Sequence, residues 1–158
     1  MTTDEVDMTQ TLKPAIVEKV DSTYLETLIG YNARRAALSI IEIFLERMAV
    51  YNLRIVDFSV LSLISHNPGI SSRQLCSSLN ILPPNLVGMI NALQNRELVV
   101  RLPHPVDGRV MGLHLTQAGV KLMQDAELTA FVLEKDATQR LTPTERKTLM
   151  KLLQKIYT

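Results

Sequence analysis

A stripe of uncharged side chains offers the clearest chemistry in this sequence. Asparagines, a glycine and an alanine recur at helical spacing between residues 83 and 95. An asparagine amide can form paired hydrogen bonds with adenine, and small residues let a helix reach the floor of a DNA major groove. An ordinary surface helix would show the same stripe, so the pattern taken alone leaves both interpretations open. The residues expected at the groove floor are Pro84, Asn85, Gly88, Asn91 and Ala92.

A second candidate for chemistry is the polar loop around Asp107 and Gly108, which separates two apolar segments, residues 98–102 and 110–115. These segments are predicted to be paired strands, and Asp-Gly favours a tight turn between them. Arg109 then lies near the tip of a hairpin, where it can reach a minor groove or a phosphate. We expect the Asp107 carboxylate to orient the Arg109 guanidinium through a charged hydrogen bond.

Phosphate-binding groups are expected at a helix start and on the first strand. Ser71, Ser72 and Arg73 begin a predicted helix, where unpaired backbone amides and the helix dipole favour anions. Arg101, on the first strand, is a further candidate for DNA contact. For Arg96 and Arg101, a solvated charge or an internal pair is as good an interpretation as a phosphate contact.

Helices must position these residues, and local signals predict where the helices begin and end. The first helix of this region is predicted at residues 54–66. A capping box from Ser71 to Gln74 starts a short second helix, which Asn80 ends. Two consecutive prolines, residues 83–84, start the third helix, because the first amides of a helix have no partner to lose.

A long helix is predicted before this region. Thr23 and Glu26 form a capping box, from which the helix should run to about Tyr51. Because this helix is apolar around most of its circumference, it needs two packing partners. Its expected core stripe consists of Leu25, Leu28, Ile29, Ala36, Ile40, Phe44 and Met48.

Two further helices are predicted after the hairpin. Thr116 caps a helix that extends to roughly Arg140, and a capping box with a proline in its first turn, residues 142–145, starts the last helix. We expect the single apolar face of this last helix to dock against the first helix of another subunit. That face consists of Leu149, Leu152, Leu153 and Ile156.

The order of these elements, with Asp-Gly-Arg at residues 107–109 and Leu-Thr-Gln-Ala-Gly at residues 115–119, resembles the MarR family of winged-helix regulators. The resemblance implies a mainly α fold with a small β-hairpin wing, in a homodimer joined through its N- and C-terminal helices. It also implies a transcriptional repressor that binds a pseudo-palindromic DNA operator and is released by a small aromatic or carboxylate ligand. The expected organisation is a flexible arm at residues 1–20, an N-terminal helix at 21–53, a winged helix-turn-helix DNA-binding domain at 54–115 and dimerising C-terminal helices at 116–158.

The resemblance also places a ligand pocket where the first, second and fifth helices meet the winged domain. Arg34 or Arg35 can clamp a carboxylate there while an aromatic ring packs against Tyr31 or Phe58. Each arginine can instead pair with an acidic residue of the same chain or with a partner subunit. The candidate ligand residues are Tyr31, Arg34, Arg35, Arg47, Tyr51 and Phe58.

Composition limits the classes of protein that fit. The 158 residues suffice for one compact domain or a dimer subunit, and 46% of them are hydrophobic, a surplus that favours burial in an oligomer. No run approaches the ~18 apolar residues of a membrane span, and a single cysteine fits a reducing cytoplasm. The net charge is only +1, but residues 69–115 contain four arginines against two acidic groups, which gives modest attraction for phosphate.

Two competing functions fit the sequence less well. An enzyme would need a phosphate loop, a nucleophile motif, paired carboxylates or a metal motif; because we find none, we expect no catalysis, cofactor or metal. His66, His104 and His114 lack metal-ligand spacing, and Cys76 is expected to be a buried or half-buried filler. A winged-helix module that binds protein without specific DNA binding would keep the fold but would usually lose the uncharged stripe and Arg109.

Overall fold

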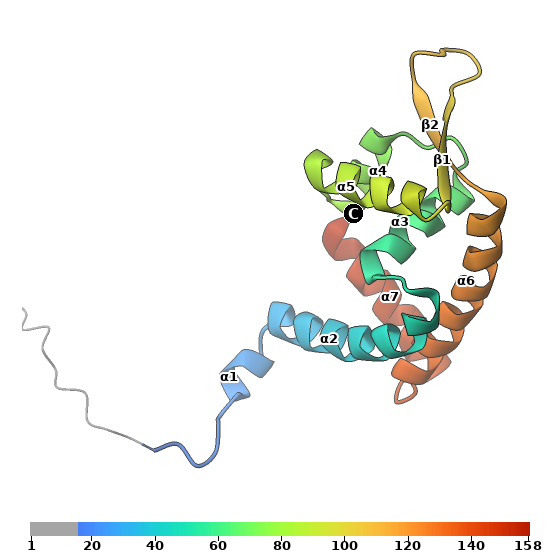
Figure 1. The fold of residues 1–158 in the computed structure, drawn as a ribbon. Coiled ribbons are helices and arrows are strands. Elements are labelled where there is room, and N and C mark those ends of the chain that lie inside the picture. The colour runs from blue at the N-terminus through green and yellow to red at the C-terminus, as the bar shows by residue number, and fades with distance from the viewer. Residues whose placement is uncertain (1–15) are drawn as a thin grey trace, which may run out of the picture. The chain divides into compact units, whose positions relative to one another are not determined.

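The computed structural model describes residues 16–158, so most of the arm expected at residues 1–20 lies outside the described residues. The chain divides into two compact units, residues 1–35 and 36–158. Figure 1 shows the elements in chain order. They are α1 (Thr23–Glu26), α2 (Ile29–Met48), the 3-10 helix η1 (Ala49–Tyr51), α3 (Ile55–His66), α4 (Ser72–Leu79), α5 (Pro83–Asn95), β1 (Val99–Pro103), β2 (Met111–Leu115), α6 (Gln117–Ala137) and α7 (Pro143–Tyr157).

The N-terminal unit contains a break that the sequence did not predict. Instead of one continuous helix, α1 and α2 are separated by two residues. The Asn32 side-chain amide donates to the backbone carbonyls of Glu26 and Leu28, at 2.8 and 2.9 Å, so one side chain bridges the two helices. The capping box expected at residues 23–26 is also wrong, because the N-cap of α1 is Ser22, which makes no side-chain cap.

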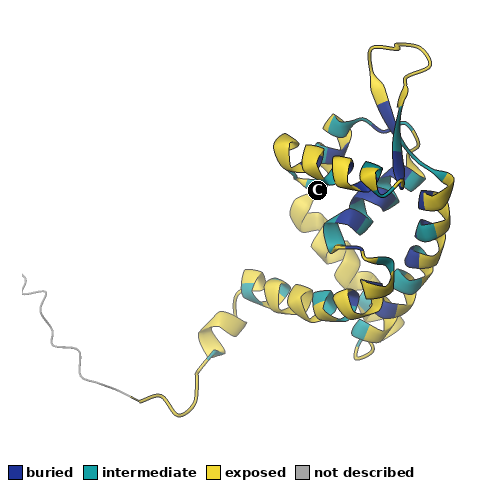
Figure 2. Ribbon diagram, in the orientation of Figure 1, coloured by how far each residue is buried: buried dark blue, intermediate teal, exposed yellow. Residues whose placement is uncertain are grey.

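The second unit has a core beneath its helix-turn-helix. Figure 2 shows buried residues where α3, α4, α5 and the hairpin meet. The core face of α5 consists of Leu86, Ile90 and Leu93, which are each 1% exposed. Full burial of one such side chain contributes about 1.5–3 kcal/mol. This packing fixes the rotation of α5 and turns its opposite face toward solvent.

Local caps define α4 and α5 as the sequence predicted. The Ser71 Oγ accepts the Gln74 backbone N–H at 3.3 Å, and the Gln74 Oε1 accepts the Ser71 N–H at 2.9 Å, which confirms the capping box. Asn80 ends α4 in the left-handed conformation. Pro83 and Pro84 occupy the first turn of α5. These signals act over a few residues, which is why the sequence alone located both helices.

The base of the hairpin is anchored to the turn before α4. β1 and β2 are antiparallel, with Arg101 opposite Leu113. Leu113 also exchanges two backbone hydrogen bonds with that turn: its carbonyl accepts from Gly69 at 2.8 Å and its N–H donates to Ile70 at 2.9 Å. A Cβ atom on Gly112 would lie 2.8 Å from the Gly69 Cα, so only a glycine fits at this close approach. The wing is thereby fixed to the helix-turn-helix.

α6 lies against α3 and extends the core. Met123 and Ala126 of α6 are buried. The Glu127 carboxylate accepts a hydrogen bond from the Ser62 Oγ at 2.8 Å and lies 3.0 Å from the His66 Nε2. Apolar packing and this polar cluster together hold the two helices side by side.

α7 begins at the predicted capping box, but none of its side chains is buried by the described residues. The backbone and side chain of Thr142 donate to the Glu145 carboxylate, and these hydrogen bonds lower the pKa of Glu145. None of the residues of α7 is buried. Its apolar face, predicted from the sequence, is exposed at Leu149, Leu152, Leu153 and Ile156.

Other apolar side chains are also uncovered. Of the stripe predicted to be the core face of the first helix, only Phe44 and Met48 are buried; the prediction is wrong for the rest, of which Ile40 is half-buried and the others are exposed. Phe131 of α6 is 75% exposed. Among the described residues, no single helix is long and apolar enough to cross a membrane, and only the bent pair Ile29–Tyr51 and Ile55–His66 meets that requirement jointly.

The link between α5 and β1 contains a strained residue, Glu97, whose φ is 57°. A left-handed backbone costs a residue with a side chain roughly 1–2 kcal/mol, whereas glycine adopts it freely. Glu97→Gly should therefore raise the free energy of unfolding by about 1 kcal/mol, as measured by urea denaturation. Glu97→Ala is the control because alanine keeps the strain, and an equal gain from alanine would contradict this explanation.

Candidate nucleic-acid interface

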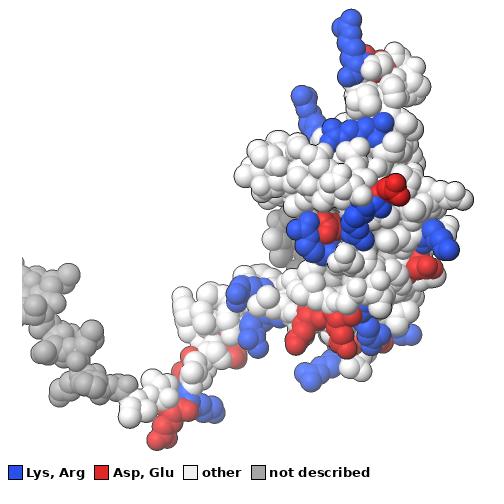
Figure 3. Space-filling model, viewed as in Figure 1, with Lys and Arg blue, Asp and Glu red and all other residues white. Residues whose placement is uncertain are grey.

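The solvent-facing side of α5 carries no charge. The helix contains no lysine, arginine, aspartate or glutamate between Pro83 and Asn95. Figure 3 shows this uncharged surface over α5, with basic atoms bordering it on the side of the wing. All five residues predicted for the groove floor are exposed on it: Pro84, Asn85, Gly88, Asn91 and Ala92. Their shared exposure makes this face available to a partner.

Sequence reasoning missed an apolar member of this face, Val87, which is 50% exposed. Valine is usually assigned to a core by its type. The available signal was its position, because Val87 falls outside the spacing of Leu86, Ile90 and Leu93 that defines the buried side. An exposed apolar residue among amides adds a methyl-bearing group to the candidate interface.

Two arginines hold the C-terminal end of α5 in place. Arg96 donates to the backbone carbonyls of Asn52 and Tyr51, at 2.8 and 3.0 Å. The Arg101 Nε donates to the Gln94 Oε1 at 3.2 Å, which ties the first wing strand to α5. Of the alternatives left open by the sequence, internal pairing thus accounts for both arginines. A phosphate contact by Arg101 stays a prediction and would have to use its other guanidinium nitrogens.

The start of α4 has fewer free amides than predicted. The Ser71 N–H already donates to the Gln74 side chain, so it is not available to a phosphate in this conformation. Ser72 is half-buried and Arg73 is exposed. Phosphate contact by Ser71, Ser72 and Arg73 therefore stays a prediction, with Arg73 as the most accessible of the three.

The wing tip is organised by His104 and Asp107. The Asp107 Oδ1 accepts the Arg109 backbone N–H at 3.1 Å. Within residues 16–158 no ion pair joins this carboxylate to the Arg109 guanidinium, so the predicted bond between the two side chains is wrong. A short carboxylate readily reaches the backbone two residues further on. The His104 Nδ1 accepts the N–H groups of Val106 and Asp107, at 3.2 and 3.3 Å, a role that sequence reasoning missed. Arg109 is exposed and has no ion-pair partner within residues 16–158.

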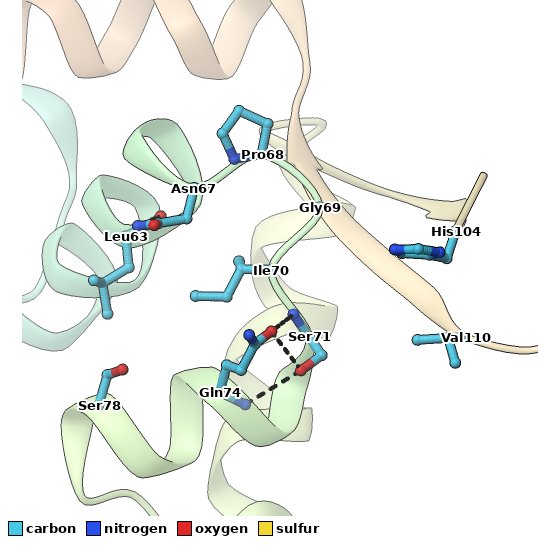
Figure 4. A pocket seen from close by; sticks show the side chains of 10 residues that line it. All are labelled: Leu63, Asn67, Pro68, Gly69, Ile70, Ser71, Gln74, Ser78, His104 and Val110. Carbon is cyan, nitrogen blue, oxygen red and sulfur yellow. Dashed lines mark hydrogen bonds between the residues drawn. The ribbon is translucent and has the colours of Figure 1, made fainter. Parts of the chain in front are cut away.

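An open hollow of about 860 Å³ lies between α4 and the wing residues His104 and Val110. Figure 4 shows three borders of the hollow. They are the end of α3 together with the turn that follows it, the helix α4, and the wing residues His104 and Val110. Several of its polar side chains already have partners: Ser71 bonds Gln74, and the Asn67 amide donates to the Leu63 carbonyl. None of the residues predicted to bind a small ligand lines this hollow.

Three predicted ligand residues lie in the N-terminal unit. Tyr31 and Arg35 border a shallow hollow of that unit, together with Glu26 and Asn32. Arg34 is exposed on the same helix but does not line this hollow. Ligand binding by Tyr31, Arg34 and Arg35 stays a prediction.

The other three predicted ligand residues lie in the second unit, and each has a partner there. The Arg47 Nη2 lies 3.4 Å from the Asp136 Oδ2, and the Tyr51 hydroxyl lies 2.8 Å from the Thr129 Oγ1. Phe58 packs edge-on against another phenylalanine ring, with centroids 5.5 Å apart. A ligand would have to share or displace these partners, so this part of the pocket also stays a prediction.

The histidines and the cysteine occupy separate places in the fold. His66 belongs to the cluster between α3 and α6, His104 to the wing tip and His114 to β2. Cys76 is half-buried on α4, as predicted. In the part of the chain that the structure describes, no three His, Cys, Asp or Glu side chains are grouped so that they could hold a metal ion.

The chain is similar to known regulators over most of its length. A family model described as the MarR family matches residues 53–111. At 34% sequence identity, the chain is similar to a transcriptional repressor, CouR, whose structure contains a 23-mer DNA duplex; the alignment covers 89% of this chain and 99% of that chain, with a TM-score of 0.82. The chain belongs to the MarR family.

Two further relatives of this MarR-family chain bear on its role. A structure of the transcriptional repressor CouR bound to p-coumaroyl-CoA is 33% identical, with a TM-score of 0.78, and the alignment covers 87% of this chain and 97% of that chain. A curated relative from Thauera aromatica, named as a transcriptional regulatory protein for the hcr operon, is 32% identical over 100 residues. That match covers 63% of this chain and 60% of the relative, which is less than two thirds of the relative's length.

Family membership confirms the resemblance seen in the sequence and the predicted fold class. Residues 16–158 are mainly helical and carry one antiparallel hairpin, β1–β2, as expected for a MarR-family winged helix. The region matched by the family model contains α3, α4, α5 and β1. The domain boundaries placed at residues 20, 53 and 115 stay predictions.

Proposed function

We propose that this MarR-family chain is a transcriptional repressor that binds a pseudo-palindromic DNA operator as a homodimer and is released by a small ligand. One observation carries the proposal: a firmly packed α5 presents an uncharged, exposed face, and Arg109 extends from the adjoining wing. Small and amide side chains suit a major-groove floor, and an exposed wing arginine suits a minor groove or a phosphate. The CouR relative bound to a 23-mer DNA duplex supports this use of the fold.

The homodimer follows from the apolar surface that the chain leaves uncovered. Contiguous exposed apolar faces mark interaction sites in soluble proteins. Leu152 and Ile156 of α7 are 55% and 66% exposed, and a second copy that buried these faces would remove them from water. A two-fold dimer would also place two copies of α5 about 34 Å apart, one turn of DNA, to match two half-sites.

For the effector we favour an aromatic acyl thioester of coenzyme A, because the CouR relative binds p-coumaroyl-CoA. This narrows the aromatic or carboxylate ligand expected from the sequence. Arg34 and Arg35 provide guanidinium groups, which pair well with the phosphates of such a molecule. The ligand can release DNA only if it binds the DNA-free form more tightly than the DNA-bound form. The proposed mechanism needs no catalytic step and no cofactor. We place the protein in the cytoplasm, where a repressor meets its DNA.

Selection of genomic DNA fragments by the purified protein tests the function directly. At ~0.15 M salt, we expect enrichment of one inverted repeat, and loss of that enrichment when p-coumaroyl-CoA is added. Equal affinity for all fragments, changing only with the salt concentration, would contradict the proposal, as would no binding at all. Either result would favour a winged-helix module that binds protein. An inverted repeat that survives p-coumaroyl-CoA would uphold DNA binding and reject this class of effector.

Arg109→Ala should weaken binding to every DNA sequence by about tenfold, because one charged hydrogen bond to DNA is lost. If Arg109 contacts a phosphate, the slope of log affinity against log salt should also fall by about one. Fluorescence anisotropy on the enriched repeat and on a scrambled duplex measures both. Arg140→Ala, which removes the same charge from the exposed turn after α6, is the control. Equal affinities for all three proteins would show that the wing does not touch DNA.

Asn85→Ala or Asn91→Ala should instead cost ~1–3 kcal/mol mainly at one base position, as expected for a side chain that reads a base edge. The measurement is affinity for a set of operators with single base-pair changes. A uniform loss over the whole set would assign these asparagines to backbone contact.

A further inference from the structure

The exposed face of α5 offers a restricted chemistry. It has amide groups and apolar groups, and no cation lies anywhere in the helix. The basic side chains just beyond its end, Arg96 and Arg101, are bound to backbone carbonyls and to Gln94. The exposed residues that α5 presents are Pro83, Pro84, Asn85, Val87, Gly88, Asn91, Ala92 and Asn95.

Base pairs differ in the hydrogen-bonding and methyl groups that their major-groove edges offer to such a face. Guanine offers two acceptors that are most often read by arginine or lysine. Adenine offers a donor and an acceptor that match the amide of asparagine, and thymine offers a methyl group that apolar side chains contact. The groups on α5 therefore match both members of an A·T pair and lack the usual partner of guanine.

Val87 is the apolar group best placed for this readout. It is 50% exposed, although a β-branched residue neither favours a helix nor solubilises its surface. Val87 is thus unfavourable both for helix propensity and for solubility, and a local preference that is broken at an exposed site indicates a functional role. Asn91 lies four residues further on, so its Cβ is about 5–6 Å away on the same side of the helix. Neighbours at this distance can reach the same or adjacent base pairs.

Resting on the proposed DNA-binding function, we propose that α5 reads A·T base pairs, with Val87 packing against the 5-methyl group of a thymine and Asn91 bonding a nearby adenine. Gly88, beside Val87, leaves open space, since a Cβ there would meet no atom within 4 Å. That space lets the helix backbone come close to the base edges. Val87 is then a specificity-determining residue, whereas Arg109 and Arg73 contribute affinity without reading these pairs.

The test begins with selection from a random-sequence DNA duplex library by the full-length protein. Selection is then repeated with the Asn91→Ala protein, and the base positions that lose their preference are identified. We expect those positions to be adjacent A·T pairs in each half-site enriched by the wild type. Guanine–cytosine pairs fixed at those positions would overturn the inference while leaving the proposed function intact. Absence of any enriched sequence would overturn the proposed function, and this inference with it.

The second step removes the thymine methyl groups from the selected duplex by replacing thymine with deoxyuridine, one position at a time. Wild-type affinity should fall about fourfold at one position in each half-site, as expected for one methyl group taken out of contact. Val87→Ala should bind the thymine duplex at least about fourfold more weakly than the wild type. Its affinity should not change when deoxyuridine replaces thymine at that position. Val120→Ala, the same change at a 43% exposed position of α6, should keep wild-type sensitivity. Equal sensitivity of wild type and Val87→Ala would overturn the role of Val87.

Discussion

Gly119→Ala should destabilise the protein by about 3 kcal/mol or more, near the upper end for a group forced into a packed site. A Cβ built on Gly119 would lie 2.2 Å from the Leu98 carbonyl oxygen and 3.3 Å from the Leu115 Cβ. The carbonyl cannot easily yield, because it accepts the Thr116 N–H at 3.0 Å. The Leu98 N–H is likewise bound to the Leu93 carbonyl, at 3.0 Å. An alanine would therefore push apart the end of α5, the wing and the start of α6.

Urea denaturation followed by circular dichroism measures this loss. Gly108→Ala is the matched control, since it adds the same methyl group at a position where no atom lies within 4 Å. We expect the Gly108→Ala midpoint to stay close to that of the wild type. A Gly119→Ala protein with an unchanged midpoint would mean that α6 can shift away from Leu98 at little cost.

Gly119 also shows where sequence reasoning ends. The sequence predicted a helix start at Thr116, and the structure confirms it through the Thr116 Oγ1, which accepts the Gly119 N–H at 3.0 Å. Such a cap depends on residues three apart and is visible in a sequence. The need for glycine depends on the approach of Leu98, which lies across a tertiary contact. No local pattern encodes that approach.

What the sequence left open or predicted wrongly around the candidate site has the same origin. Arg96 bonds the carbonyl of Asn52, 44 residues earlier, and nothing in the spacing of the sequence indicates that pair. Asp107 was assigned to the Arg109 guanidinium, but a fixed backbone N–H is a nearer partner than a mobile side chain. The apolar stripe of the first helix was taken for a core of this chain, although most of its side chains are exposed in the part of the chain that the structure describes. Helical periodicity shows that one face of a helix is apolar. It does not show whether the same chain or another subunit covers that face.

Gly88→Ala should have two large effects of opposite sign. Glycine inside a helix costs about 1 kcal/mol relative to alanine, and a Cβ at Gly88 would meet no atom within 4 Å. The variant should therefore unfold at a higher urea concentration than the wild type. On DNA, the added methyl group would stand between the α5 backbone and the base edges, so we expect affinity for the selected operator to fall about tenfold or more, within the 1–3 kcal/mol of one good base contact.

Anisotropy titrations on the selected operator and urea denaturation of the same preparations measure the two effects together. Gly30→Ala, in α2, is the matched control because its Cβ also meets no atom within 4 Å; it should leave operator affinity unchanged. Higher stability with unchanged affinity in Gly88→Ala would mean that α5 stays more than a methyl group away from the bases. Lower stability would instead assign Gly88 to packing within the protein. A loss of affinity in a more stable protein cannot come from unfolding, so that result would place Gly88 at the DNA surface.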